Sequence, residues 1–455
     1  MPRRSSTVTS LLVTALAGLT ILCAPRAAGA QTRLTLEQVI TRSLAGPRAG
    51  MARADRAAAE ARVAEADAAR LPRLSATGFV TASPDIDCVG ADCTRTDPDD
   101  FALRFSGVFA GGQVQATQPL YTFGKLGAAR AAARAGVDAQ RALEDATAGD
   151  LAVDAARAYW GLKLARELGY MLDDGIDEVT KALARLDERL EAGDDEVTIL
   201  DRQRVEVLLA EGKVQRAEAT GGERAALAAL RALTGVADVD IDDGELAALP
   251  LELGDEAGAL ARAQAGNPQA RAAAAGARAA EQLVALERGA YWPDLALVGQ
   301  LQISRAQGAE EPPSAYAYDP FNSTTGGLVL ALRWQIEPWT TRARVRRADA
   351  GAARAAELSA LARTGASYEA QVARAEADSA RARIDAATTG EAAARSWMAA
   401  VLQADAVGTA EAKDLADAYL AWFQMRARLL TAIYQWNVAV AKVARAAGQL
   451  PTATR

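Results

Sequence analysis

The sequence predicts an α+β fold made of two tandem repeats, each built from long helices and two β-strands. A pair of prolines 25 residues apart occurs twice, as Pro47 and Pro72 and again as Pro268 and Pro293, with the copies offset by 221 residues. After each pair, a short segment alternates between apolar and other residues, and a long alanine-rich helical segment follows later. A repeat of this length indicates one structural unit used twice.

Residues 1–30 are predicted to be a signal peptide. Arg3 and Arg4 precede an apolar stretch over 8–23, and Ala28-Gly29-Ala30 provides small residues before a cleavage point at Gln31. An exported protein is therefore expected. The alternatives to a cleaved signal peptide are an uncleaved anchor and acylation of Cys23.

Charge and composition exclude several function classes. The signal segment holds three arginines and no acid, so its removal changes the formal net charge from −7 to −7 − 3 = −10, which disfavours nucleic acid as a partner. The chain has no histidine, which removes His-dependent catalysis and imidazole metal sites. No pattern favours an enzyme, and we predict no catalytic residue, metal site or cofactor.

Cys88 and Cys93 are the two cysteines of the mature chain. They flank a short loop, and export would place them in an oxidising compartment, so we expect a disulfide between them. Two free thiols are the alternative.

The first repeat is predicted over residues 31–236. A helix over 37–69 ends before Pro72 because the residue before a proline favours extended geometry. Period-two alternation then predicts strands at about 74–82 and 104–118. A helix to about 192 follows, in which Gly175 marks a possible break. Gly193 should form a tight turn with acids capping the return helix, which stops at Thr234-Gly235.

Apolar residues around the predicted turn are spaced by three, four or seven, which is typical of a coiled coil. This predicted heptad seam comprises Leu183, Leu186, Leu190, Val197, Leu200, Val207 and Val214.

The second repeat is predicted over residues 256–450, after an acidic, irregular linker at 237–255 and before a tail at 451–455. A helix runs to about Tyr291, and strands follow at about 294–304 and 326–336. Helix resumes near Thr341, turns near Gly408 and returns to Gly448.

The strands suggest a membrane setting. In the fourth strand one face is continuously apolar, while Arg333 and Gln335 lie on the other, which fits lipid outside and a wet lumen inside. Four strands cannot close a barrel, but three chains would supply twelve. Aromatic residues at the strand–helix junctions would form an interfacial belt, although a packing role there is the alternative. They are Tyr121, Phe123, Tyr291, Trp292, Trp334 and Trp339.

These features together resemble the TolC family of outer-membrane efflux channels, also called outer membrane factors. The resemblance covers essentially the whole mature chain. It is carried by Leu71-Pro72-Arg73-Leu74-Ser75, by Gln118-Pro119-Leu120-Tyr121 running into Gly124, and by the turn at Gly193 with its return helix. The resemblance implies a homotrimer in which a twelve-stranded outer-membrane barrel continues into an α-helical tunnel through the periplasm. It also implies a periplasmic adaptor (membrane fusion) protein and an inner-membrane transporter as partners.

The resemblance also implies a periplasmic aperture at the helix turns, Gly193 and Gly408. It places Asp414 and Asp417 where some members carry aspartates around the constriction; two solvated acids are the alternative. The positions where some members lock the mouth with tyrosine and arginine are Asp405 and Ala410 here, so that lock is not expected.

We therefore expect a passive exit duct of a tripartite efflux or type I secretion system, exporting small molecules or proteins. The alternative is a periplasmic coiled-coil adaptor or scaffold without a pore, which long helical hairpins alone would suit. The apolar faces of the third and fourth strands argue against that alternative.

Overall fold

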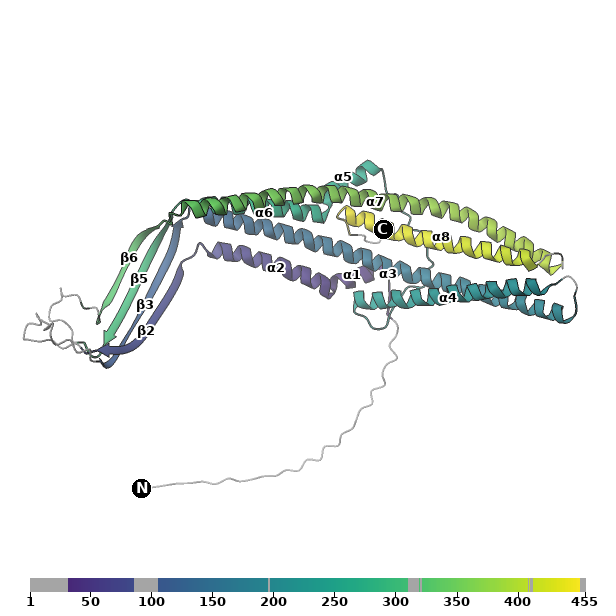
Figure 1. The fold of residues 1–455 in the computed structure, drawn as a ribbon, viewed down its shortest axis with the longest axis horizontal. Coiled ribbons are helices and arrows are strands. Elements are labelled where there is room, and N and C mark those ends of the chain that lie inside the picture. The colour runs from purple at the N-terminus through teal and green to yellow at the C-terminus, as the bar shows by residue number, and fades with distance from the viewer. Residues whose placement is uncertain are drawn as a thin grey trace, which may run out of the picture.

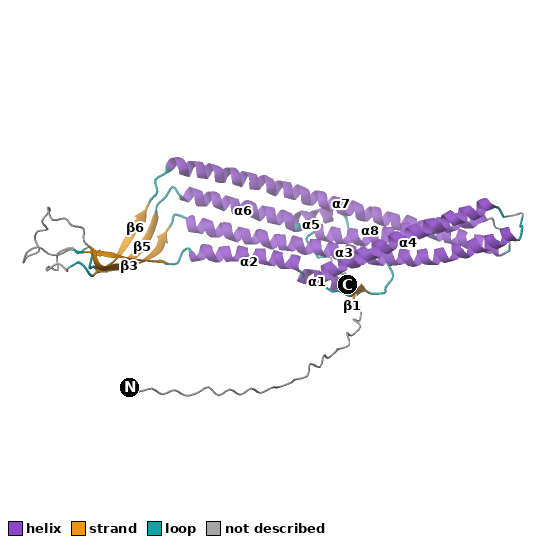
Figure 2. Cartoon of the chain, turned by 60° about the horizontal axis from the view of Figure 1, so that its bottom comes forward, coloured by secondary structure: helices purple, strands orange, loops and turns teal. Residues whose placement is uncertain are grey.

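The structure is a computed structural model that describes residues 32–85, 105–194, 197–309, 319, 321–407, 409 and 412–450. The molecule is elongated, with a β-sheet at one end and long helices running from it to the opposite end (Figures 1 and 2). The predicted signal peptide, the Cys88–Cys93 disulfide and the turn residue Gly408 lie outside the described residues. Among the described residues, no helix combines the length and hydrophobicity needed to cross a membrane.

The order of elements confirms the predicted α+β fold of two tandem repeats. Each half contains one three-residue strand, two short-to-medium helices, two longer strands and a long helix that pairs with a shorter return helix. The first half comprises β1 (Thr32–Leu34), α1 (Leu36–Ala45), α2 (Pro47–Ala68), β2 (Arg73–Pro84), β3 (Phe105–Tyr121), α3 (Lys125–Glu191) and α4 (Ile199–Thr234). The second comprises β4 (Val239–Ile241), α5 (Glu256–Gly266), α6 (Pro268–Gly289), β5 (Asp294–Ala306), β6 (Thr324–Arg333), α7 (Pro338–Ala406) and α8 (Ala412–Ala446).

The predictions of a single helix over 37–69 and of another from 256 to Tyr291 were wrong, because the first helical segment of each repeat is divided in two. Gly46 is extended, with φ −73° and ψ 173°, and Asn267 also leaves the helical region, with ψ 120°. Each precedes a proline that opens a new 22-residue helix. Proline disfavours helical geometry in the residue before it but fits the first turn of a helix, so both breaks have the same cause.

The two longest helices, α3 and α7, contain 67 and 69 residues. At about 1.5 Å per residue each spans roughly 100 Å. Gly175 does not break α3. Instead, a Cβ at this position would overlap the Phe423 ring of α8, so the glycine allows the two helices to pack closely.

Helix α3 ends in a turn at Gly193, whose φ is +73°. Asp194, the described acid after it, does not cap the next helix as predicted. Asp194 forms an ion pair with Arg189 at 2.6 Å, and Thr198 caps α4 in a capping box with Asp201. The turn is thus longer than expected, and this resets the helical phase of α4.

Four strands form one antiparallel sheet in the order β2-β3-β5-β6. Residues pair in regular register through the centre of the sheet, for example Thr77 with Gln113 and Gln113 with Gln302. Pairing shifts near Leu120, between Pro119 and Tyr121, where β3 approaches the helices. The outer strands β2 and β6 each have one edge without a partner in the described chain.

A second, two-stranded sheet was missed by sequence analysis. Strand β4 lies inside the segment predicted to be an irregular linker. Residues of β1 and β4 pair in parallel, with Leu34 opposite Ile241. Both side chains are buried with Leu162 of α3 and Leu230 of α4 in the largest hydrophobic cluster. This cluster fastens the linker to the middle of the helical region. Three-residue strands carry too little alternation to be recognised beforehand.

Candidate functional site

The sheet has two chemically different faces, because successive residues of a strand point to opposite sides. The pairing register assigns each residue to a face: Leu74 lies opposite Ala116, which pairs with Gly299, which pairs with Leu328. We call this side the apolar face. Its larger apolar residues are Leu74, Val80, Val108, Val114, Leu295, Leu297, Leu301, Ile303, Leu328, Leu330 and Leu332. Gln118 and Arg305 lie on the same side, towards the two ends of the sheet.

The opposite side, which we call the polar face, carries hydroxyl and amide side chains. Gln113 pairs directly with Gln302, and Gln115 with Gln300, so amides form two adjacent rows across the centre of the sheet. Ser75, Thr77, Thr117 and Thr325 flank these rows. A sheet with one apolar and one water-compatible face can separate lipid from an aqueous lumen.

The predicted aromatic residues gather at the end of the sheet where the helices begin. The Tyr121 and Phe123 rings meet edge to face at 4.7 Å between centroids, and Phe123 stacks on Trp292 at 5.7 Å. The Trp334 indole donates a hydrogen bond to the Tyr291 carbonyl at 3.2 Å. The structure thus brings five of the six residues into two contacting groups.

Trp339, the sixth, stands apart at the start of α7 with 81% of its surface exposed. The other five are also exposed in the single chain, which favours an interfacial position over a packed core. Their role as a membrane belt stays a prediction.

The junction between β3 and α3 has an unusual backbone. Phe123 has φ +46° and Gly124 φ +85°, so two consecutive residues adopt left-handed geometry. Lys125 then donates a hydrogen bond to the Trp292 carbonyl and forms an ion pair with Asp294 at 2.8 Å. These bonds fix the direction of α3 relative to β5.

At the other end of the molecule, the predicted heptad seam is only half correct. Leu186 and Val197 are buried, and Leu183 and Leu190 pack against them. In α4, however, Leu200, Val207 and Val214 are 67%, 70% and 55% exposed. The residues of α4 that pack instead are Val205, Leu208 and Leu209. The longer turn after Gly193 shifted the phase, so an apolar stripe spaced by seven remains on the outside of α4.

Asp414 and Asp417 lie in the first turns of α8 and are both exposed. A different side of α8 packs against α3 and α7, through Leu415, Ala418 and Tyr419. The two aspartates therefore share the unpacked side of the helix. Ala410 lies outside the described residues, and only the backbone of Asp405 is described.

A buried lysine in the middle of the helices was not anticipated. Lys163 of α3 is 6% exposed and donates to Asp242 at 2.9 Å and to the Gly244 carbonyl at 2.8 Å. Asp242 also accepts a hydrogen bond from Tyr159. Burial alone would raise the pKa of Asp242, but the bonds from Tyr159 and Lys163 outweigh it and hold that pKa below its usual range. The cluster fastens the linker after β4 to α3.

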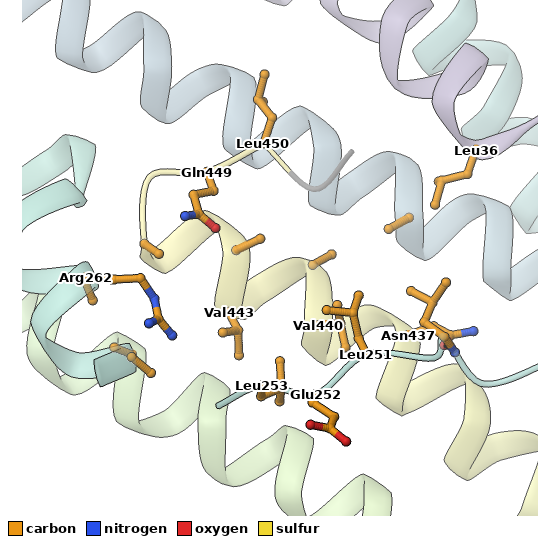
Figure 3. Close-up of a pocket in the computed structure, with 18 of the residues that line it drawn as sticks. Leu36, Leu251, Glu252, Leu253, Arg262, Asn437, Val440, Val443, Gln449 and Leu450 are labelled. Atoms are coloured by element: carbon orange, nitrogen blue, oxygen red, sulfur yellow. The ribbon is translucent and has the colours of Figure 1, made fainter. Parts of the chain in front are cut away.

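The same linker continues along α8 and borders a pocket of 410 Å³ (Figure 3). Leu251 and Leu253 lie close to Val440 and Val443 of α8. Asn437, which is 1% exposed, accepts from Leu249 N–H and donates to the Ala247 carbonyl, both at 2.9 Å. The polar group of Asn437 is thus used to hold the linker, and we assign the pocket no function. Among the described residues, no group of three or more acidic or cysteine side chains could hold a metal ion.

The fold matches solved outer-membrane channels. The chain superimposes on the outer-membrane channel OprN with a TM-score of 0.75 at 18% identity, covering 92% of this chain and 93% of that chain. For the CmeC outer membrane channel of Campylobacter jejuni the TM-score is 0.75 at 16% identity, covering 92% and 87%. For the outer membrane protein VceC of Vibrio cholerae it is 0.73 at 17%, covering 91% and 96%. These comparisons define an outer-membrane channel fold.

A model of the outer membrane efflux protein family matches residues 47–236 and 259–449. The chain therefore belongs to the outer membrane efflux protein family, and it is an efflux duct of the outer membrane that extends into the periplasm. No curated protein shows a significant sequence match. The family assignment confirms the predicted resemblance and argues against an adaptor without a pore.

Proposed function

We propose that three copies of this chain form one passive exit duct, with a twelve-stranded barrel in the outer membrane. The observation that carries the proposal is the two-faced sheet with unpaired edges on β2 and β6. Backbone groups without a hydrogen-bond partner cost several kcal/mol each in lipid, so these edges need further strands. Three sheets of four strands joined edge to edge supply them and turn every polar face inward.

The helices would continue the barrel as a tunnel. All four long segments, α2, α3, α6 and α7, run from the same end of the sheet (Figure 2). Alanines dominate their buried contacts, which allows close approach of the helices and a thin, curved wall. In this proposal the cargo moves through the tube by diffusion and the driving force comes from elsewhere.

The partners proposed for this duct are a periplasmic adaptor and an inner-membrane transporter. The exposed stripe of Leu200, Val207 and Val214 on α4 supports a helical partner near the turns, because residues repeating every seven suit packing against another helix. The proposed cargo is small molecules or proteins.

We further propose that Asp414 and Asp417 line the periplasmic aperture. Three copies would place six carboxylates around one axis, and such rings favour cations. Replacing both residues with alanine should lower the preference for K⁺ over Cl⁻, measured from the reversal potential of single channels in a salt gradient.

A matched control exists on α3. Asp174 and Asp177 are also exposed aspartates three residues apart, and no ion pair to either is seen in the described chain. The Asp174→Ala/Asp177→Ala variant should change the reversal potential less than the α8 variant does. Equal reversal potentials in wild type and the α8 variant would remove Asp414 and Asp417 from the aperture while leaving the duct intact.

A further inference from the structure

Three phenylalanines meet on the polar face at the end of the sheet farthest from the helices. Phe79 of β2 and Phe109 of β3 pack edge to face at 4.9 Å between ring centroids, and Phe109 packs on Phe321 at 5.6 Å. The register places Phe79 and Phe109 on the side of the glutamine rows, because Phe79 pairs with Gly111 and Thr81 with Phe109. We call these three residues the aromatic cluster.

Local structure holds Phe79 and Phe321 in place. A Cβ on Gly111 would lie 2.7 Å from the Phe79 ring, so the ring occupies space that only glycine leaves open. Phe321 precedes β6, and Asp319 accepts hydrogen bonds from the backbone N–H groups of Phe321 and Asn322 at 2.8 and 3.0 Å. Asn322 in turn accepts from Ala306 N–H at 2.9 Å. The aromatic cluster is therefore fixed on the polar face, while Phe79 remains 43% exposed.

The layers of the polar face next to the cluster carry no charged residue among the described strands, whereas Arg73, Asp294 and Arg333 lie on the same face at its helical end. From the cluster towards the helices, successive layers of the polar face are Phe79, Gly111 and Ser304; then Thr77, Gln113, Gln302 and Thr325; then Ser75, Gln115, Gln300 and Gly327. Uncharged amides and hydroxyls do not sort molecules by charge. At the end of the sheet farthest from the helices, the aromatic cluster is therefore the feature of the polar face with a strong chemical preference.

We propose that the aromatic cluster is a binding site for aromatic, lipophilic small molecules at the outer end of the duct. This rests on the proposed function, since only closure into a barrel makes the polar face a lumen. Each copy contributes one cluster, and three clusters at one level would narrow the exit with aromatic surface. Aromatic rings bind other rings edge to face or offset, and their faces attract organic cations. Molecules of this class would pause here as they leave.

The test uses tetraphenylphosphonium as the probe and single-channel conductance as the readout. Tetraphenylphosphonium should block the wild-type channel when it is added on the side of the bilayer nearest the end of the sheet farthest from the helices. The Phe79→Ala/Phe109→Ala variant should need about tenfold more probe for half block, because ring contacts are lost. Phe105→Ala is the matched control, because Phe105 is an exposed phenylalanine of the same strand outside the cluster, and it should keep the wild-type block.

Should the alanine variant fail to assemble, Phe79→Leu/Phe109→Leu keeps apolar volume, and the same weakening is expected. Block of equal strength in wild type and the double variant would overturn the binding site. So would equal block by tetraethylammonium, which has no ring. A wild-type protein that conducts but is not blocked refutes the binding site alone, whereas a protein that never conducts refutes the duct as well.

Discussion

Gly175 shows how one residue sets the distance between two helices. Because a side chain there would overlap Phe423, Gly175→Ala should destabilise the fold by about 1–3 kcal/mol, the range for overpacking a core. Gly136 lies in the same helix with nothing within 4 Å of its Cβ position, so Gly136→Ala should be neutral or stabilise by up to about 1 kcal/mol. Thermal unfolding of the two variants measures the difference.

Equal unfolding temperatures for the Gly175→Ala and Gly136→Ala proteins would contradict this packing role of Gly175. The clash can also be relieved from the other side. Combining Gly175→Ala with Phe423→Ala should cost less than the sum of the two single changes, because the pair shares one contact.

Asp242 gives the fold a dependence on pH. Its pKa in the folded protein lies below its ordinary value, so the stabilisation it provides is present above about pH 4 and disappears as pH falls through the folded pKa. Asp242→Asn should lower the free energy of unfolding by about 1–2 kcal/mol at pH 7, a modest figure because the Asp242 side chain is 42% exposed. The gap from wild type should shrink at pH 3.

Thermal unfolding at the two pH values measures this gap, and Asp243→Asn is the control, since Asp243 pairs with the exposed Arg33 rather than with Lys163. A gap between wild type and Asp242→Asn that stays constant from pH 7 to pH 3 would show that the ionised carboxylate is not what holds the linker.

At the scale of elements, the sheet makes the sharpest prediction. Leu330 lies on the apolar face and Gln300 on the polar face. Leu330→Arg should impair assembly in the outer membrane, since a lipid-facing arginine costs about 2–4 kcal/mol at the bilayer midplane. Gln300→Arg should assemble, because its charge would face water. The amount of folded protein in outer-membrane fractions distinguishes the two, and equal loss for both would refute the assignment of faces.

The sequence predicted elements wherever a strong period repeats over many residues. Strand faces followed from alternation through Leu295, Leu297 and Leu301, and the register confirms them. Features that depend on a few residues were harder to predict from the sequence. The phase of α4 depended on the length of the turn before Thr198, and the exposed Val207 was therefore placed in the seam. The aromatic cluster escaped notice because its members, Phe79, Phe109 and Phe321, are far apart in sequence and only pairing brings them together.

At the scale of the whole molecule, the two repeats place chemically distinct regions in a line. The sheet carries lipid-compatible and water-compatible faces, the middle is fastened by the buried Lys163 and the linker, and the helical turns expose Asp414 and Asp417. Helices of about 100 Å separate the sheet from the turns. In the proposed duct, cargo would enter at the turns and leave beyond the sheet.

The most direct test of this account is single-channel conductance of the purified mature protein in a planar lipid bilayer, with the number of chains per particle measured by light scattering. A water-filled trimeric duct predicts discrete conductance steps from particles of three chains. Particles of one chain, or trimers that never conduct, would contradict the proposal that the polar faces of three sheets enclose a lumen.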